Sequence, residues 1–509
     1  MKPWMLATIL LALSAGSAGA APLSLVDAAQ QQASAQALAL IGAGADVNAA
    51  SADGTTPLMW AAHSGDYPLV VALLKAHAKV DLTNAYGANA MLQAAQFGDV
   101  RIIEALLKSG ANVDSPNPDG ETALMGVARA GNVEAGKLLL KAGARVNARE
   151  NFRGQTALMW AAAQSQPEMV KLLIAFHADV NARSLVNTNR RQVTGEPRAQ
   201  ARPPGGMTPL LYAARQGCLS CVRYLDEGHA DLNLADPEGI TPMLIATENF
   251  NFDIAAYLLR HGADVNRWDW WGRTPLYAAV DLNTLPYGGR ADHISMDDTT
   301  SLKLIGMLLD AGANPNAQLR KFPPYRALGA DRGGDTLLTT GTTPLLRAAK
   351  AGDAAAIRLL LAHHALPDLG NNSDVTPLMA AAGVGTTGVD TRGKYKTQAE
   401  ASEAIRLLVQ GGADVNATDV RGLTALHGAA LLGSDEVIRT LAGQKARLDI
   451  KDKRGITPLD MALGKGGGLG RGGEGATVHQ STADLLKQLL ADNAQGGTAP
   501  PTAANTTAR

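Results

Sequence analysis

Short apolar stretches, each bounded by glycine or a small polar residue, return along the chain at a regular interval. One phrase marks the interval: threonine, then proline or alanine, then leucine or methionine, as in Thr56-Pro57-Leu58. Its copies begin at residues 56, 89, 122, 156, 208, 241, 274, 343, 376, 424 and 457, with asparagine replacing threonine at 89. Uninterrupted copies start 33 residues apart, and once 34. This self-similarity predicts a chain built from repeated supersecondary units.

Each unit carries the signals of two short helices. Threonine can cap the first helix and proline tolerates its first position, and a small pair such as Ala61-Ala62 allows close packing. The second helix has apolar residues at helical spacing, for example Ile102, Ile103, Leu106 and Leu107. It stops at a glycine suited to the left-handed conformation, as in the Gly262–Asn266 sequence Gly-Ala-Asp-Val-Asn. One such pair cannot cover its own apolar face, so we expect the units to stack into a solenoid.

The units resemble the ankyrin repeat, a β-turn finger followed by two helices. The resemblance covers about residues 30–491. It implies an all-α repeat solenoid, an ankyrin-like stack of helix-turn-helix units with β-hairpin fingers. The family's histidine after the Pro-Leu pair is kept here only as His427, and most other copies hold an apolar residue such as Met59. We therefore expect apolar contacts to replace most hydrogen bonds that this histidine makes in the family.

Interruptions of the period define the expected layout of the chain. We predict a signal peptide at 1–20, a degenerate capping repeat at 21–52, four repeats at 53–183, an inserted finger at 184–206, seven repeats at 207–495 and a disordered tail at 496–509. Further insertions are expected near residues 283–300, 319–341, 385–401 and 464–481. Loop insertions cost little free energy, so some are expected to be neutral and others to shape a partner site.

The first residues have the order of a secretory signal. Lys2 precedes a short apolar run, Met5–Leu13, and small residues lead to Ala18-Gly19-Ala20. The apolar run is too short to span a bilayer, and no later stretch is long enough. We predict an exported bacterial protein, periplasmic or secreted, with no membrane span after cleavage. The alternative is an N-terminal anchor that is never cleaved.

Composition narrows the function classes. Lys and Arg number 46 against 47 Asp and Glu, for a net charge of −1, which argues against a nucleic-acid partner. Two cysteines exclude a disulfide framework and a four-cysteine zinc site. The remaining residues form no recognisable nucleophile–base or paired-carboxylate motif. We therefore expect no intrinsic catalysis and no cofactor.

Cys218 and Cys221 form a C-x-x-C pair at the start of a second helix, where a thiolate would be stabilised. In an oxidising compartment they could close a local disulfide or exchange with one. No histidine follows Cys221, so the haem-attachment motif is absent. A structural pair is the favoured interpretation, and a redox role is the alternative.

Two further patterns have simple structural explanations. His77, His177, His229 and His364 could suggest a metal ladder, but each replaces the glycine that ends a second helix. Histidine is among the non-glycine residues enriched at positive φ, so we predict helix-end caps. The stretch Gly466–Gly473 follows a repeat helix rather than a strand, which favours a linker over a phosphate cradle.

The inserted finger from Arg183 to Gly206 is locally basic. Its five arginines against one glutamate give a local charge of +4. This charge could dock an acidic partner, although a solvated loop is the favoured interpretation.

The strongest binding signal is Arg267-Trp268-Asp269-Trp270-Trp271-Gly272, which holds three of the chain's six tryptophans. In the ankyrin-like register these rings fall on finger positions that contact ligands in the family, and tryptophan is favoured in binding hot spots. The alternative is internal packing, in which the next finger, with Phe322 and Tyr325, lies over these rings. The two interpretations are compatible if the two aromatic sets jointly build a pocket. Trp60 and Trp160 lie in the packing phrase and are predicted to be core residues.

We predict a scaffold that binds another protein or a peptide through its concave finger and helix surface. The resemblance implies this role, and the sequence assigns no oligomeric state. The predicted surface comprises His63, Gln96, Phe97, Arg129, Gln164, Arg215, Gln216, Glu248 and Asn249. The candidate partner-binding residues are Trp268, Trp270, Trp271, Phe322, Tyr325, Phe97, Arg129 and Arg215. Alternatives are an effector acting outside the producing cell, a redox role at the cysteine pair, and an enzyme with a pocket around the tryptophans.

Overall fold

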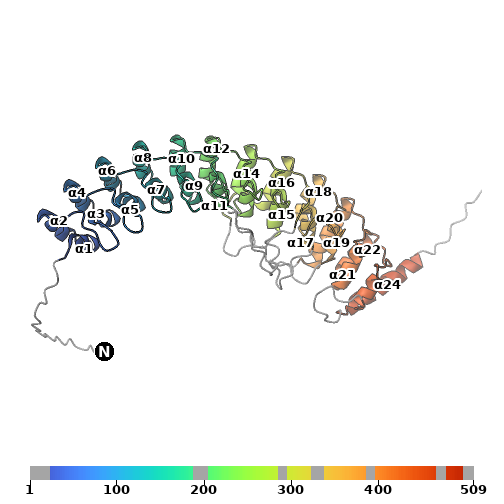
Figure 1. Ribbon diagram of the computed structural model, residues 1–509. Helices are drawn as coiled ribbons and strands as arrows, with labels where there is room; N and C mark the ends of the chain where they lie inside the picture. The colour runs from blue at the N-terminus through green and yellow to red at the C-terminus, as the bar shows by residue number, and fades with distance from the viewer. Residues whose placement is uncertain are drawn as a thin grey trace, which may run out of the picture. The chain divides into compact units, whose positions relative to one another are not determined.

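The computed structural model describes residues 23–186, 205–284, 295–321, 337–385, 396–465 and 477–496. These residues form 24 α-helices and no named strand (Figure 1). The chain divides into two compact units: Met1–Ala161 with Ala175–Ala178, and Ala162–Ile174 with Asp179–Arg509. None of the described helices is both long and apolar enough to cross a membrane.

The first unit consists of helix pairs that stack side by side. Its helices are α1 (Leu25–Gln30), α2 (Ser34–Gly42), α3 (Pro57–His63), α4 (Tyr67–Lys75), α5 (Ala90–Phe97), α6 (Val100–Lys108), α7 (Ala123–Ala130) and α8 (Val133–Lys141), and α9 (Ala157–Ala163) begins within it. The opening helices of successive repeats contact one another, α1 to α3 to α5 to α7, and form what we call the first-helix row. Helices α2, α4, α6 and α8 form a second row (Figure 1).

The second unit repeats this arrangement. Its helices are α10 (Pro167–Ala175), α11 (Pro209–Gln216), α12 (Leu219–Glu227), α13 (Pro242–Glu248), α14 (Phe252–Arg260), α15 (Pro275–Asn283), α16 (Ser301–Asp310), α17 (Pro344–Ala351), α18 (Ala354–Ala362), α19 (Pro377–Ala382), α20 (Gln398–Gln410), α21 (Ala425–Leu431), α22 (Asp435–Gly443), α23 (Pro458–Ala462) and α24 (Gln480–Gly496). Odd-numbered helices from α11 to α23 form its first-helix row.

The predicted helix starts are confirmed at atomic level. The hydroxyl of Thr208, for example, accepts a hydrogen bond of 3.2 Å from the backbone N–H of Leu211, and proline occupies the first position of α11. The same threonine cap begins α3, α7, α13, α15, α17, α19 and α23. The threonine phrase therefore determines where these helices begin.

The histidines at the ends of second helices are confirmed as caps. His77, His177, His229 and His364 have φ values of 64°, 62°, 65° and 66°, the left-handed region where glycine is usual. Among the described residues, no group of three His, Cys, Asp or Glu side chains is arranged to hold a metal ion.

Small and aliphatic residues fill the space between helices. Ala61, Ala62, Ile102, Ile103 and Leu106 are fully buried, and Leu107 is half-buried. Met59 is buried at the position of the family's histidine. The one retained histidine, His427, bonds through Nδ1 with the backbone N–H of Thr424 and through Nε2 with the carbonyl of Ile456 in the next repeat.

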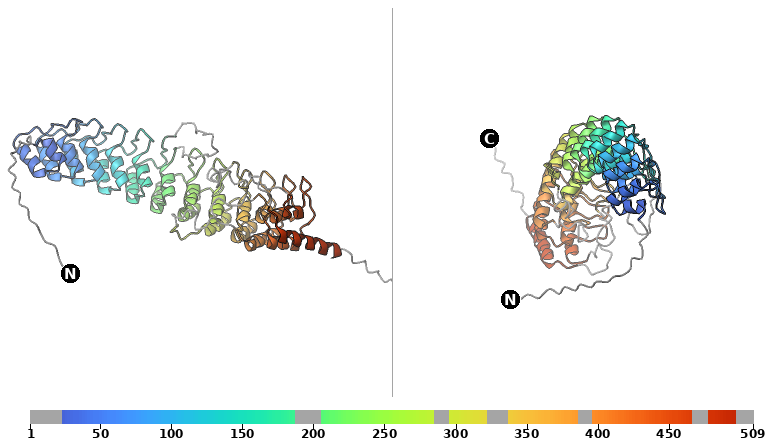
Figure 2. Two further views of the ribbon diagram at one scale, coloured as in Figure 1. Left: turned by 90° about the horizontal axis from the view of Figure 1, so that it is seen from below. Right: turned by 90° about the vertical axis from the view of Figure 1, so that its left-hand side faces the viewer.

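The fingers, meaning the connections between one repeat and the next, are tight turns rather than the predicted β-hairpins. In several of the described fingers, a residue such as Asp269 donates its N–H to a carbonyl four residues later, and the following N–H donates to a carbonyl of the preceding finger, as Trp270 does to Glu238 at 2.7 Å. A glycine with positive φ reverses the chain between them, which leaves too few residues for a ladder. The described residues contain one isolated bridge, Val186 to Gly205. The fingers of the first unit lie along one edge of its helices (Figure 2).

Candidate interaction surfaces

The segment Arg267–Gly272, which we call the tryptophan finger, is fixed by one buried carboxylate. Asp269 accepts hydrogen bonds from the backbone N–H groups of Trp271 and Arg273, at 3.0 and 2.9 Å, and from Nε of Arg273 at 2.6 Å. Gly272 has φ +84°, and a Cβ there would lie 2.6 Å from the backbone nitrogen of Arg320. Because the turn is held by side chains and by a close neighbour, its rings have defined positions.

The structure separates the three tryptophans that the sequence pattern grouped together. Trp268 and Trp270 are 46% and 52% exposed, whereas Trp271 is 5% exposed. Trp271 follows the tip of the turn, where the chain heads back into the molecule, and the Arg273 guanidinium lies 5.0 Å from its ring centroid. Trp271 is therefore a packing residue, and the prediction of an outward-facing role was wrong for it.

The next finger does approach the exposed indoles. The backbone N–H of Arg320 donates to the carbonyl of Trp271 at 2.8 Å. Its guanidinium carbon lies 3.5 Å from the centroid of the Trp268 ring, and Nζ of Lys321 lies 3.1 Å from that of Trp270. Phe322 and Tyr325, which we expected over these rings, lie outside the described residues. The result is a surface that is both aromatic and cationic.

A chain of charges, in which Asp269 and Arg273 are buried and Glu248 is half-buried, supports this finger. Arg273 pairs with Asp269 at 2.5 Å and with Glu248. Burial raises the pKa of Glu248 to about 7, although the Arg273 charge opposes this shift. Burial also raises the pKa of Asp236, in the preceding finger, to about 6. Glu248, predicted to lie on the binding surface, thus serves mainly as a partner of Arg273.

The other candidate residues fall in both units. Phe97 and Arg129 are exposed in the first unit, where the His63 ring packs edge-on at 5.0 Å from that of Phe97. Arg215 belongs to the second unit and is half-buried, with its guanidinium 5.4 Å from the ring centroid of Tyr212. Arg183 lies at the start of the inserted finger, and its Nη1 donates to the carbonyl of Gly206 at 3.1 Å. The remaining arginines of that finger lie outside the described residues.

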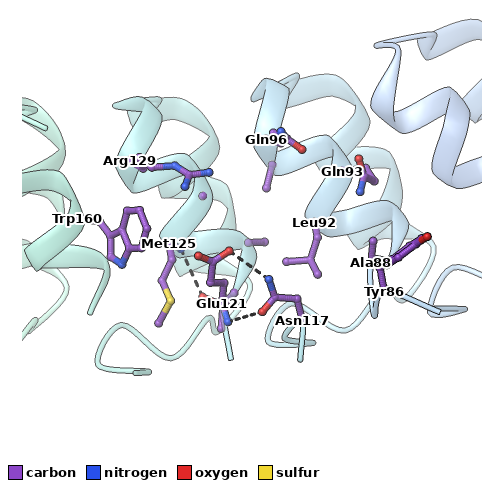
Figure 3. A pocket seen from close by; sticks show the side chains of 14 residues that line it. Tyr86, Ala88, Leu92, Gln93, Gln96, Asn117, Glu121, Met125, Arg129 and Trp160 are labelled. Atoms are coloured by element: carbon purple, nitrogen blue, oxygen red, sulfur yellow. Dashed lines mark hydrogen bonds between the residues drawn. The ribbon is translucent and has the colours of Figure 1, made fainter. Parts of the chain in front are cut away.

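Trp60 and Trp160 are half-buried rather than core residues. They lie at the same position of α3 and α9, on a side of the first helix that its neighbours cover only in part. The Arg129 guanidinium lies 5.0 Å from the Trp160 ring centroid. Trp160 also lines a cavity of about 240 Å3 in the first unit (Figure 3), which we did not predict from the sequence. A sequence feature that marks the cavity is Gly126, because the repeats before and after it have the larger residues Gln93 and Trp160 at the same position.

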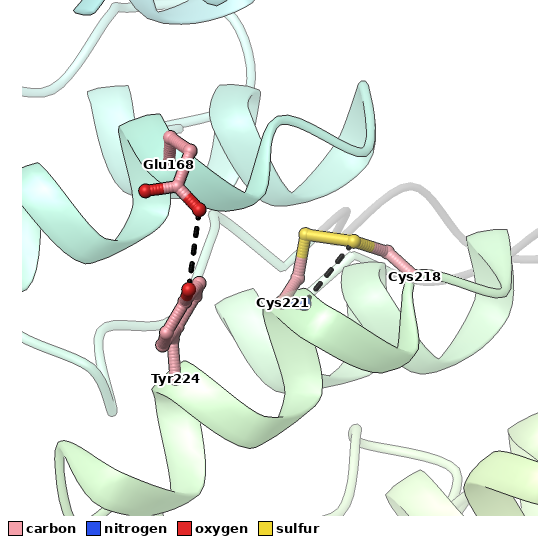
Figure 4. Close-up of a disulfide and its surroundings, with 4 residues drawn as sticks. All are labelled: Glu168, Cys218, Cys221 and Tyr224. Atoms are coloured by element: carbon pink, nitrogen blue, oxygen red, sulfur yellow. Dashed lines mark hydrogen bonds between the residues drawn. A yellow bond between two sulfur atoms is a disulfide. The ribbon is translucent and has the colours of Figure 1, made fainter.

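Cys218 and Cys221 are joined by a disulfide at the start of α12 (Figure 4). Cys218 Sγ also accepts a hydrogen bond from the backbone N–H of Cys221 at 3.2 Å. Both residues are buried. Thiol–disulfide exchange requires access of an attacking thiolate to sulfur, so this placement suits a structural bond better than an exchange site.

A model of the ankyrin repeat family matches four stretches of the chain, of which the first two overlap. It is described as ankyrin repeats in three copies, and it matches residues 25–117, 92–184, 210–319 and 395–469. These stretches together cover more than half of the chain.

Three curated relatives share short segments with this chain. It is 41% identical over 61 residues to serine/threonine-protein kinase 12 of Arabidopsis thaliana, covering 12% of this chain and 13% of that protein. It is 31% identical over 130 residues to the ankyrin repeat and KH domain-containing protein mask-1 of Caenorhabditis elegans, covering 25% and 4%. It is 39% identical over 61 residues to mouse protein phosphatase 1 regulatory subunit 12A, covering 12% and 6%. The chain therefore spans a small part of each relative. With the family model matched along most of the helix pairs, the chain belongs to the ankyrin repeat family.

Proposed function

We propose that this protein is an exported scaffold that binds another protein or a peptide through its fingers and first-helix rows. It performs no catalysis of its own, and Trp268 and Trp270 anchor its partner. Ankyrin repeats are typically non-catalytic interaction modules. The proposal of export rests on the signal-like order of residues 1–20.

The observation that carries the proposal is the pair of half-exposed indoles on a fixed turn. Trp268 and Trp270 keep about half of their surface open, while the Asp269 hydrogen bonds hold the backbone beneath them. A large ring that is already ordered loses little conformational entropy on binding. Arg320 and Lys321 add positive charge beside the rings, which favours a partner segment carrying acidic residues.

The test compares the full mature chain with a Trp268→Ala/Trp270→Ala double variant. Each is immobilised and exposed to a periplasmic extract of the producing bacterium, and a protein retained by the wild type is then purified and titrated. We expect the double variant to bind that protein at least about 30-fold more weakly, because hot-spot residues contribute about 2 kcal/mol or more. If the double variant bound the protein with unchanged affinity, the tryptophan finger would not be the anchor of the partner.

Phe152→Ala is the matched control. Phe152 is 77% exposed on a finger of the first unit, with a cation, Arg153, 5.5 Å from its ring centroid. Its removal should weaken the binding of this partner far less than the double variant does, because the partner is anchored at the tryptophan finger, and an equal loss would indicate non-specific aromatic adhesion. Trp271→Ala is unsuitable here, because deleting a buried tryptophan costs roughly 3–5 kcal/mol of stability.

A further inference from the structure

The first unit contains a hollow of about 240 Å3 between α5 and α7 (Figure 3). It arises at one position of the repeat, the fourth residue after the start of the phrase. That position holds Trp60, Gln93, Gly126 and Trp160 in four successive repeats. Three of these side chains occupy the outward face of the row, and Gly126 leaves the space between Gln93 and Trp160 open.

The inner wall of the hollow is apolar. Leu92, Ala95 and Met125 line it beside Gly126. A dry cavity of about 150 Å3 is known to hold a benzene molecule, whereas pockets for drug-sized ligands begin near 300 Å3. The volume therefore fits one ring better than a larger molecule. The Met125 thioether adds a favourable contact for an aromatic ring.

The rim carries both hydrogen-bond donors and acceptors. Gln93 and Gln96 supply amide groups, Arg129 a cation and Glu121 an anion. Glu121 is held by Asn117, whose Nδ2 donates to its carboxylate at 3.1 Å. Opposite charges at one rim oppose the binding of a strongly charged ligand of either sign. Amide and carboxylate groups around an apolar floor match the alternating N–H and C=O groups of a peptide.

A sugar fits the rim less well. Carbohydrates stack on open aromatic faces, but the Arg129 guanidinium lies 5.0 Å from the centroid of the Trp160 ring and occupies one of its faces. Tyr86, 73% exposed, stands at the opposite end of the hollow from Trp160 (Figure 3). The hollow thus has an aromatic side chain at each end, an arrangement that suits an extended segment crossing from one finger toward the next.

We propose that this hollow binds one aromatic side chain of an extended polypeptide segment, with the rim contacting the peptide groups on either side of it. The inference rests on the proposed function for its polypeptide partner, but it concerns the first-helix row of the first unit and not the tryptophan finger of the second. Filling the space at residue 126 should therefore abolish this binding without affecting the tryptophan finger.

The experiment uses the full mature chain carrying 13C-methyl methionine and follows the Met125 methyl signal by NMR, assigned with a Met125→Leu variant. The probe is the blocked tripeptide acetyl-Gly-Phe-Gly-amide. We expect a saturable shift of the Met125 signal, and roughly tenfold weaker binding of acetyl-Gly-Leu-Gly-amide, which lacks the ring. Equal binding of the two tripeptides, or no shift with either, would overturn the proposal.

Gly126→Gln and Gly126→Ala form the matched pair of variants. A Cβ at residue 126 would lie 3.8 Å from Ala95 Cβ, an ordinary contact, and the φ of Gly126 is not positive, so both should fold. Glutamine, the neighbouring repeat's residue at this position, fills the hollow and should abolish the Met125 shift. Alanine should retain it. Circular dichroism and thermal unfolding establish that both variants are folded, and persistence of the shift in Gly126→Gln would contradict the proposal.

Two further arms separate the alternatives. Methyl β-D-glucopyranoside should leave the Met125 signal unchanged, and a saturable shift that Gly126→Gln removes would assign the hollow to sugars instead. The Trp268→Ala/Trp270→Ala variant should bind the phenylalanine tripeptide as the wild type does. This readout does not depend on the tryptophan finger, so the two proposals can fail separately.

Discussion

At the scale of single residues, the second unit places charges where water is scarce. Glu248, Arg273 and Asp269 form a chain of ion pairs beneath the tryptophan finger, and Arg347 pairs with Asp281 at 2.5 Å with both side chains buried. Removing one partner of a buried pair costs more than the pair contributes, because it leaves a charge without compensation. Glu248, Arg273 and Asp269 therefore act chiefly to hold a defined geometry in the finger that carries the exposed rings.

Glu248 makes the stability of the second unit dependent on pH. Its pKa rises from an ordinary value of 4.5 to about 7 in the folded chain, chiefly through burial. Between these values the folded state retains a proton that the unfolded state releases, so the free energy of unfolding falls as the pH rises. Above pH 7 both states are ionised and this contribution stays constant.

We expect the wild type to lose up to roughly 3 kcal/mol relative to Glu248→Gln between pH 4.5 and pH 7. Glutamine keeps the shape and can still accept a hydrogen bond from Arg273, but it does not titrate. Urea unfolding of both chains at several pH values measures the difference in their free energies of unfolding. Asp236 is present in both chains, so its titration does not contribute to this difference. Parallel pH profiles would show that Glu248 is ionised normally in the folded state.

At the scale of the element, a threonine before the first helix and a glycine or histidine after the second delimit most helix pairs. The threonine hydroxyl satisfies an N–H that the first turn leaves free. The residue with positive φ after the second helix closes the other end. These local rules operate within a few residues, so they set where the helices begin and end, whereas the stability of each pair depends on stacking against its neighbours.

Thr208→Ala should destabilise the second unit by about 1 kcal/mol, because the Leu211 N–H loses its partner at a site that water reaches poorly. Thr208→Ser keeps a hydroxyl and should retain most of the stability. Hydrogen exchange of the α11 amides, measured in both variants, localises the effect. Equal protection in the alanine and serine variants would show that the cap contributes nothing.

At the scale of the whole molecule, the repeats divide into two units of different character. The first is built from uninterrupted copies of the repeat, and its first-helix row carries Trp60, Phe97, Arg129 and Trp160 at least partly exposed. The second contains the long insertions that separate some copies of the phrase by more than one repeat length. It also contains the disulfide and the tryptophan finger. The two candidate binding surfaces are thus carried by different parts of one chain.

Export is the prediction that concerns the whole chain. Expressed with residues 1–20 in a Gram-negative bacterium, the protein should appear with periplasmic markers, and its amino-terminal sequence should begin at Ala21. Leu10→Arg/Leu11→Arg interrupts the apolar run and should leave the precursor unprocessed in the cytoplasm. A full-length chain found in the membrane fraction would instead favour the uncleaved anchor.

The repeat, the helix starts, the histidine caps and the family could be predicted from the sequence, because each depends on residues close together along the chain or on a pattern repeated many times. The sequence did not separate Trp271 from Trp268 and Trp270, or place Trp60 and Trp160 partly at the surface. These points, and the hollow at Gly126, became visible only when the repeats were seen packed together. Burial of a ring and the space beside a glycine depend on side chains about 33 residues away, which meet only when neighbouring repeats stack.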